Sequence, residues 1–313
     1  MITYTFPVER ILYKVQTELP KAKSVGLLKG FENGLQNKIN LVDRDGGFTT
    51  FAEVSPSGRV TLSITYCQFL LLMCHLGFII HESFAVNSML STMTDRELEQ
   101  YHRELKFDTS EARYLREVPK YEEASAYCSK LIDIAKPLLN SEPLSETEFK
   151  AISEEVEYDS VLACYANSLC VYGIVFILLH EASHIILGQQ LTKKGTVLEE
   201  NEADHNAFWA MWGDLEGKAR NSAMMGCLCA LASLLFYNPS LIQVGSHPRE
   251  DERLFSFYDI LKNEKSSYTQ MIVFILIIWS KVYVKENPDF PQFSGSYDNT
   301  LELQRTYLSK IGV

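Results

Sequence analysis

The segment Leu178-Leu179-His180-Glu181-Ala182-Ser183-His184-Ile185-Ile186-Leu187 places an H-E-x-x-H motif inside an apolar run. Apolar residues flank the motif on both sides, so we expect a buried helix over about 171–188. Residues four apart share one face of a helix, and the imidazoles of His180 and His184 can therefore bind one metal ion. Glu181 lies about 100° further round, where its carboxylate can take a proton from a metal-bound water.

An acidic segment, Glu199-Glu200-Asn201-Glu202-Ala203-Asp204, follows the motif and offers the ligand that is still missing. A catalytic zinc ion normally takes three protein ligands and keeps an open position for water. On a second helix, over about 198–213, Glu200 and Asp204 share a face. We therefore assign Glu200 as the third ligand and Asp204 as the acceptor of the other N–H of a zinc-bound histidine, most simply His180. Glu202, and less readily Glu199, stay open as alternative ligands because sequence does not fix the phase of the helix.

A third block, Ser246-His247-Pro248-Arg249-Glu250-Asp251-Glu252-Arg253, has the form H-P-x-x-x-x-R. His247 and Arg253 are candidate donors to the oxyanion that develops when water attacks a peptide carbonyl. The same letters also fit a turn before a helix, with Pro248 at its first position and Arg253 paired with a nearby acid. Both interpretations remain open at this stage.

In this order, the three blocks resemble the family of the phage exclusion protein Lit, bacterial zinc peptidases of abortive infection. The shared blocks span about residues 171–256. The resemblance implies a zinc endopeptidase of the gluzincin type that cleaves an intracellular protein in anti-phage defence. In the family's known case the substrate is a translation factor, elongation factor Tu, and a phage-derived signal activates cleavage. The third block is also similar to a segment of membrane-embedded zinc peptidases of the heat-shock and prenyl-protein-processing type.

Composition limits the partners that the chain can have. Its 313 residues include 40 acidic and 29 basic ones, a net charge of −11 that repels phosphate backbones and argues against nucleic acid as a partner. The seven cysteines are an odd set without C-x-x-C spacing, which is typical of reduced core residues. No basic and apolar leader begins the sequence, so we expect a cytoplasmic protein that acts on protein or peptide.

Periodicity and turn signals predict a mostly helical α+β fold in a single zinc peptidase domain over residues 1–313. We expect a first helix over 8–35, then a three-stranded antiparallel sheet over 38–42, 48–54 and 59–64, packed on the pair of zinc-binding helices in a gluzincin-like manner. Apolar helices are expected over 66–82, 222–236 and 266–285. The charged segment 94–150 is expected to be a solvated helical insertion, with a lid over the site as one role for it.

Three alternatives remain from the sequence. A peptidase-like module could sense or bind a protein without cutting it, but such a module would not need the base Glu181. A structural zinc site would need a fourth protein ligand, which only Asp204 or His247 offers. A membrane-associated processing peptidase would need a spanning helix, yet the segment from Leu62 to Ile80 carries several polar side chains and Met271 to Trp279 is too short. Membrane insertion is therefore not expected.

Overall fold

The fold is built almost entirely from helices in the computed structural model. It describes residues 39–42, 52–54 and 60–311, apart from gaps at 108, 141, 143, 156–160, 188, 190–195, 239, 242–246, 262, 264–265, 285–288 and 294. The helices in chain order are α2 (Ile64–Thr92), α3 (Asp95–Glu104), α4 (Ser110–Glu117), α5 (Tyr121–Leu139), α6 (Glu146–Glu155), α7 (Val161–Ile186), α8 (Val197–Asp214), α9 (Gly217–Leu234), α10 (Glu250–Leu261), α11 (Ser266–Tyr283) and α12 (Tyr297–Ile311). The helix expected over residues 8–35 lies outside the described part of the chain.

The predicted antiparallel sheet is wrong. The strands β1 (Ile39–Val42), β2 (Ala52–Val54) and β3 (Val60–Ser63) are only three or four residues long and lie in the order β1-β3-β2. Strand β1 runs parallel to β3, and only β2 is antiparallel to it. A parallel neighbour requires a crossover between β1 and β3 instead of two hairpins in succession. Since turn signals do not reveal which strands pair, the meander expected from the sequence does not form.

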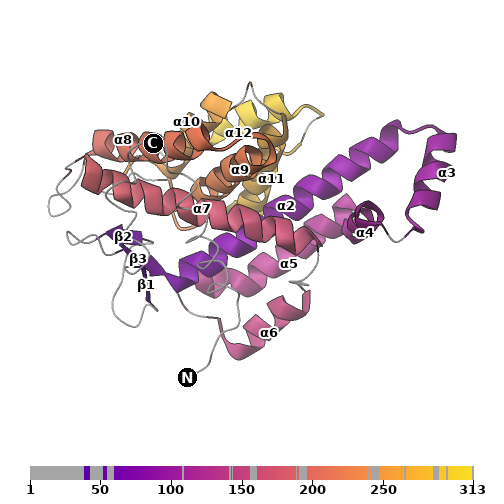
Figure 1. Cartoon of the computed structure of the whole chain (residues 1–313), viewed down its shortest axis with the longest axis horizontal. Coiled ribbons are helices and arrows are strands. Elements are labelled where there is room, and N and C mark those ends of the chain that lie inside the picture. Colours follow the sequence, from indigo (N-terminus) through magenta and orange to yellow (C-terminus); the bar gives the residue numbers. More distant parts are fainter. Residues whose placement is uncertain are drawn as a thin grey trace.

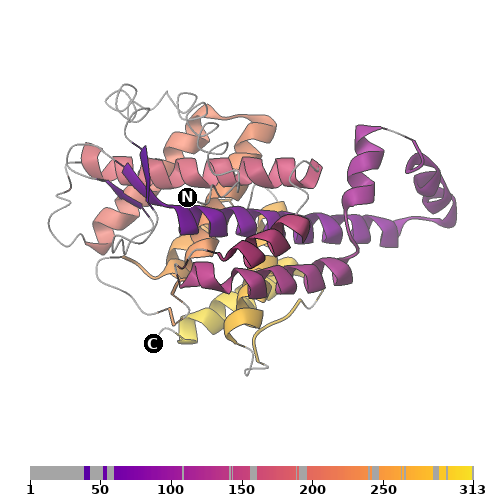
Figure 2. The same ribbon diagram turned by 90° about the horizontal axis from the view of Figure 1, so that it is seen from below.

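Helices α2 and α7 form the centre of the molecule. Both are apolar on every side over most of their length, which is typical of helices that other helices surround. Helix α7 packs against α2, α8 and α9, and α2 also packs against α5 and α11. Figures 1 and 2 show α2 and α7 side by side beneath the layer of C-terminal helices. The first turns of α2 follow directly from β3, so the sheet lies beside the C-terminal half of α7 (Figure 1).

Within the described part of the chain, two helices are long and apolar enough to span a membrane by length and composition, α2 and the segment Leu162–Ile186 of α7. In their most apolar windows, 78% and 72% of the residues are buried inside the protein. Core helices of this kind pass the same test as membrane spans, so these segments carry little weight for membrane insertion.

The segment 94–150 does not behave as one solvated insertion. Helix α5 buries Ala124, Cys128, Leu131 and Ala135 in the main core against α2. Helices α3 and α4 are short and charged, and they lie near the end of α2 that is remote from the sheet (Figure 1). This placement does not support a lid over the H-E-x-x-H motif, because the motif lies in the half of α7 next to the sheet.

Two glycines bring α7 and α9 into close contact. A Cβ atom on Gly226 would lie 2.5 Å from the carbonyl oxygen of Leu169 and 2.9 Å from the Cβ of Tyr172. A Cβ on Gly173 would lie 3.0 Å from the carbonyl oxygen of Gly226. Only glycine lets the two backbones approach this closely. The contact holds α9 against the helix that carries the histidines.

Candidate active site

Helix α7 presents both histidines of the motif on one buried face. The rings of His180 and His184 are nearly perpendicular, with centroids 4.8 Å apart, and their Nε2 atoms lie 3.2 Å from each other. The spacing of four residues predicts this convergence, and the structure places the two rings side by side. Both side chains are buried, so each ring nitrogen needs a partner inside the protein.

Helix α8 brings the acidic segment to the same place. Its first turn is fixed by a capping box, in which Thr196 and Glu199 exchange hydrogen bonds at the helix N-terminus. One residue later, the buried Glu200 carboxylate faces both histidines, with Oε2 3.4 Å from Nε2 of His180 and Oε1 3.7 Å from Nε2 of His184. One ligand atom from each of these three residues lies within 4.8 Å of the other two. The structure therefore groups the three ligands predicted from the sequence.

The surroundings of these three residues fit a cation between them. Nδ1 of His180 lies 2.8 Å from Oδ1 of Asp204, and Nδ1 of His184 lies 2.6 Å from Oε1 of Gln189. Both neighbouring oxygens are acceptors, so a metal ion bound at the Nε2 atoms would leave the ring protons on Nδ1. Both Nε2 atoms face the Glu200 carboxylate. Among the described residues no donor meets Oε2 of Glu200 in hydrogen-bonding geometry. A divalent cation would give the Glu200 oxygen a partner. Two imidazoles with one carboxylate form a zinc donor set with an open position.

Asp204 is held in place by Arg253. The guanidinium donates from Nε to Oδ2 and from Nη2 to Oδ1, both at 2.7 Å, in a buried two-pronged contact. Although burial opposes charge on both groups, Arg253 and His180 hold the pKa of Asp204 below its usual range. Burial also opposes charge on His180, but the neighbouring carboxylates of Asp204 and Glu200 raise its pKa to about 9. The site thus attracts positive charge strongly.

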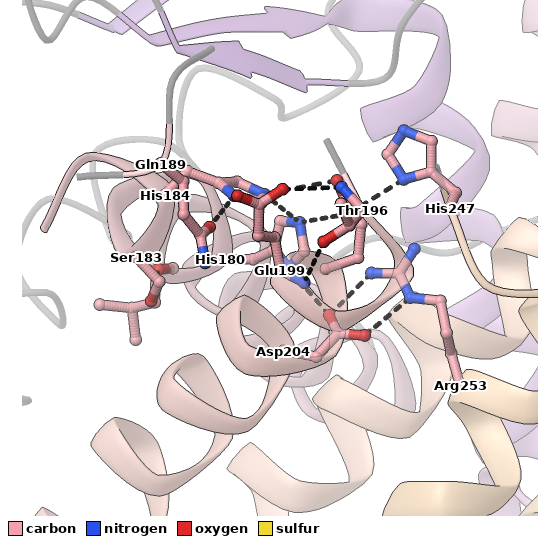
Figure 3. A network of polar contacts seen from close by, with 11 residues as sticks. His180, Ser183, His184, Gln189, Thr196, Glu199, Asp204, His247 and Arg253 are labelled. Atoms are coloured by element: carbon pink, nitrogen blue, oxygen red, sulfur yellow. Dashed lines mark hydrogen bonds and ion pairs between the residues drawn. The ribbon is translucent and has the colours of Figure 1, made fainter. Parts of the chain in front are cut away.

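Arg253 pairs with a nearby acid, which is one of the two interpretations of its role. Its Nε and Nη2 are both engaged by Asp204, so we assign it to orienting that carboxylate rather than to the oxyanion. Of the two interpretations of the H-P-x-x-x-x-R block, pairing with a nearby acid is the one that fits. Figure 3 shows the resulting chain from His180 through Asp204 to Arg253.

His247 stands at the open side of the cluster. Its Nδ1 lies 3.0 Å from Oε2 of Glu200, and 55% of its side chain is exposed to solvent. Figure 3 shows the ring at the edge of the network of polar contacts. This position keeps it within reach of a bound substrate, so the predicted role as a donor to the oxyanion remains open.

Glu181 and a pocket lie together beside the histidines. A pocket of about 410 Å³ reaches His180, Glu181, His247 and Arg253. Burial raises the pKa of the Glu181 carboxyl, although the two histidines oppose that rise. The remaining pocket lining is mostly apolar and comes from α2, α7, α9 and β2, with a few residues beyond them: Ala52, Tyr66, Phe176, Ile177, Ala230, Leu231, Leu234, Tyr237, Asn238 and Glu250. The carboxylate of Glu181 thus lies at the border between the apolar pocket and the candidate metal centre.

The two alternative carboxylates have other roles. Glu199 caps α8 through the backbone N–H of Thr196, at 2.7 Å. Glu202 is exposed and accepts a hydrogen bond from Nε2 of Gln189 at 3.2 Å. Neither belongs to the group of converging ligand atoms. Sequence reasoning missed Gln189, because a glutamine in a loop has no spacing that signals a metal site.

Together, the fold and the site define a helical protein with a candidate His-His-Glu metal centre at the edge of a pocket. The chain belongs to the Peptidase U49 family, whose model matches residues 61–273 and so includes every residue of the site. It is therefore a hydrolase of peptide bonds, and its substrates are proteins or peptides. The resemblance to the Lit family is confirmed at the level of this peptidase family. Neither the comparison with curated proteins nor that with solved structures found a match.

Proposed function

We propose that this chain is a zinc-dependent endopeptidase that cleaves an intracellular protein during defence against phage. The observation that supports the zinc dependence is the convergence of two imidazole nitrogens and one carboxylate, with Glu181 beside them. His180, His184 and Glu200 would hold the ion. When bound, zinc would polarise the scissile carbonyl and lower the pKa of its water towards neutrality.

The protein's own groups supply the proton transfers and the orientation. Glu181 takes the proton of the attacking water and later returns it to the leaving amine. The raised pKa of Glu181 suits this double role, because a more basic carboxylate accepts a proton more readily. Asp204, held by Arg253, keeps the Nε2 lone pair of His180 directed at the centre. His247 lies at the open side, where it can donate to the carbonyl oxygen under attack.

The pocket and the neighbouring strand account for substrate binding. Strand β2 lies at the edge of the sheet and contributes Ala52 to the pocket, and β2 also contacts α7. An extended substrate segment can add to such an edge through main-chain hydrogen bonds. The apolar walls then favour an apolar side chain next to the scissile bond. Elongation factor Tu is the first substrate to test, on the strength of the resemblance to the Lit family.

The test compares wild-type protein with Glu181→Gln in lysates of uninfected and phage-infected bacteria. We expect a fragment of one host protein after infection with the wild type and a rate at least about 100-fold lower with Glu181→Gln, the typical contribution of a general base. Both proteins should hold the same amount of zinc. Fragments produced equally by both proteins would remove Glu181 from the mechanism. Bound zinc without a fragment under any condition would favour a sensing module that does not cut.

A further inference from the structure

The segment between the two metal helices contributes a contact that the family motifs do not include. Gln189 lies just beyond α7, and its backbone N–H donates to the carbonyl oxygen of His184 at 3.0 Å. Its side-chain Oε1 lies 2.6 Å from Nδ1 of the same histidine. Gln189 therefore holds His184 by both main chain and side chain. Figure 3 shows its amide between the ring of His184 and helix α8.

Glu202 determines which way this amide faces. The carboxylate of Glu202 only accepts hydrogen bonds, so the atom of Gln189 that meets it at 3.2 Å has to be the amide nitrogen. The amide oxygen then faces His184 and requires a proton on Nδ1 of that ring. This proton position leaves the lone pair on Nε2, the atom directed at Glu200 and His180. An exposed residue on α8 thus controls the tautomer of a buried ligand on α7.

The two histidines are oriented by different means. His180 relies on a buried ion pair between Asp204 and Arg253. His184 relies on the neutral amide of Gln189 and the exposed carboxylate of Glu202. Because Glu202 and Glu200 lie on the same helix, the second contact also ties the α7 end of the connecting segment to the helix that carries the third ligand.

We propose that Gln189 and Glu202 form a positioning pair that fixes the tautomer of His184 and thereby raises the affinity of the centre for zinc. This inference rests on the zinc site proposed above. Loss of an outer partner of a metal-bound histidine typically weakens metal binding by about 10- to 100-fold. We expect Gln189→Leu to fall in this range. Glu202→Gln should cost less, since the amide of Gln189 can still adopt the correct orientation part of the time.

A reciprocal exchange separates positioning from a merely structural role. Gln189→Glu alone would place two carboxylates against each other, and we expect zinc affinity to fall about 10-fold or more. Combining Gln189→Glu with Glu202→Gln restores hydrogen bonds from His184 through position 189 to position 202. In it, the new carboxylate at position 189 accepts from His184, and the new amide at position 202 donates to that carboxylate. The double variant should therefore bind zinc within about threefold of the wild type, the mark of a coupled pair.

Zinc affinity is measured by competition with a chelator, without reference to peptidase activity. Asn201→Ala, an exposed change on the same turn of α8, is the matched control and should leave affinity unchanged. A double variant that binds zinc no better than Gln189→Glu would overturn the positioning pair. Wild-type affinity in Gln189→Leu would also overturn it while leaving the zinc site intact. A wild-type protein without zinc affinity would overturn both proposals.

Discussion

At the candidate metal centre, several charged residues lie within ion-pair distance of one another. Asp204 and Arg253 form a largely buried ion pair that supports His180 from behind. A buried ion pair contributes little net stability compared with an apolar pair, but removing one partner strands the other charge in the core. The pair is therefore best explained by its effect on His180. Removing one partner is expected to cost much more stability than replacing both by apolar residues.

Replacing Asp204 by Asn should destabilise the metal-free protein by about 3–5 kcal/mol, because Arg253 is left buried without a counter-charge. Urea unfolding in the presence of chelator measures this loss without a contribution from zinc. The matched control is Asp259→Asn. Asp259 makes a similar two-pronged contact with Arg305, at 3.0 and 3.2 Å, but both side chains are more than a third exposed. The control should lose less than about 1 kcal/mol, and equal losses would contradict this account.

The sequence predicted the site more completely than the partners of each residue. The H-E-x-x-H spacing and the acidic segment place His180, His184 and Glu200 together because helix geometry is regular. Arg253 bonds to Asp204, which is one of the two roles that the sequence left open for it, since the block fits a donor to either group. Gln189 was missed because its role depends on its position just beyond α7, which local spacing does not encode.

At the scale of elements, the site is a property of three packed helices. Helix α7 carries two candidate ligands, α8 carries the third, and α9 forms much of the apolar wall of the pocket. The strands were harder to predict than the helices. Each short strand gave a local signal, but the parallel pairing of β1 with β3 depends on a connection whose path the turn residues do not specify.

Gly226→Ala should separate α9 from α7. The new methyl group would lie 2.5 Å from a backbone oxygen of α7, so one helix has to move. We expect a loss of about 2–3 kcal/mol in the free energy of unfolding, typical of overpacking. The matched control is Gly77→Ala on α2. Its methyl group would make ordinary contacts with the side chains of Ile275, at 3.4 Å, and Cys229, at 4.0 Å, and helix propensity favours alanine by up to about 1 kcal/mol. Both free energies come from denaturant unfolding, and a neutral Gly226→Ala would contradict the close contact.

At the scale of the whole molecule, most of the hydrophobic core lies away from the candidate metal centre. The core extends through α2, α5, α7, α9, α10 and α11, whereas the candidate ligands lie near the C-terminal end of α7 and in the first turn of α8. Structural zinc sites normally have four protein ligands and support folding outright, while a catalytic site keeps an open position. We therefore expect the chain to fold without a metal ion.

Removal of zinc with a chelator should leave the helical circular dichroism signal unchanged and lower the midpoint of thermal unfolding by only a few degrees. A ligand present at 100 times its Kd stabilises the folded state by about 2.7 kcal/mol, which sets the scale of the shift. Zinc added back should restore the midpoint and peptidase activity together. Collapse of the helical signal on chelation would instead indicate a structural zinc ion.

The central claim is that His180, His184 and Glu200 bind one zinc ion that serves peptide hydrolysis. X-ray absorption at the zinc edge, combined with metal analysis of the purified chain, tests it most directly. We predict one zinc per chain with two imidazole nitrogens at about 2.0–2.1 Å, the remaining ligands being oxygen. Glu200→Ala should lose most of the zinc, and Glu199→Ala should retain it. An absence of zinc, or sulfur ligands at about 2.3 Å, would contradict the account.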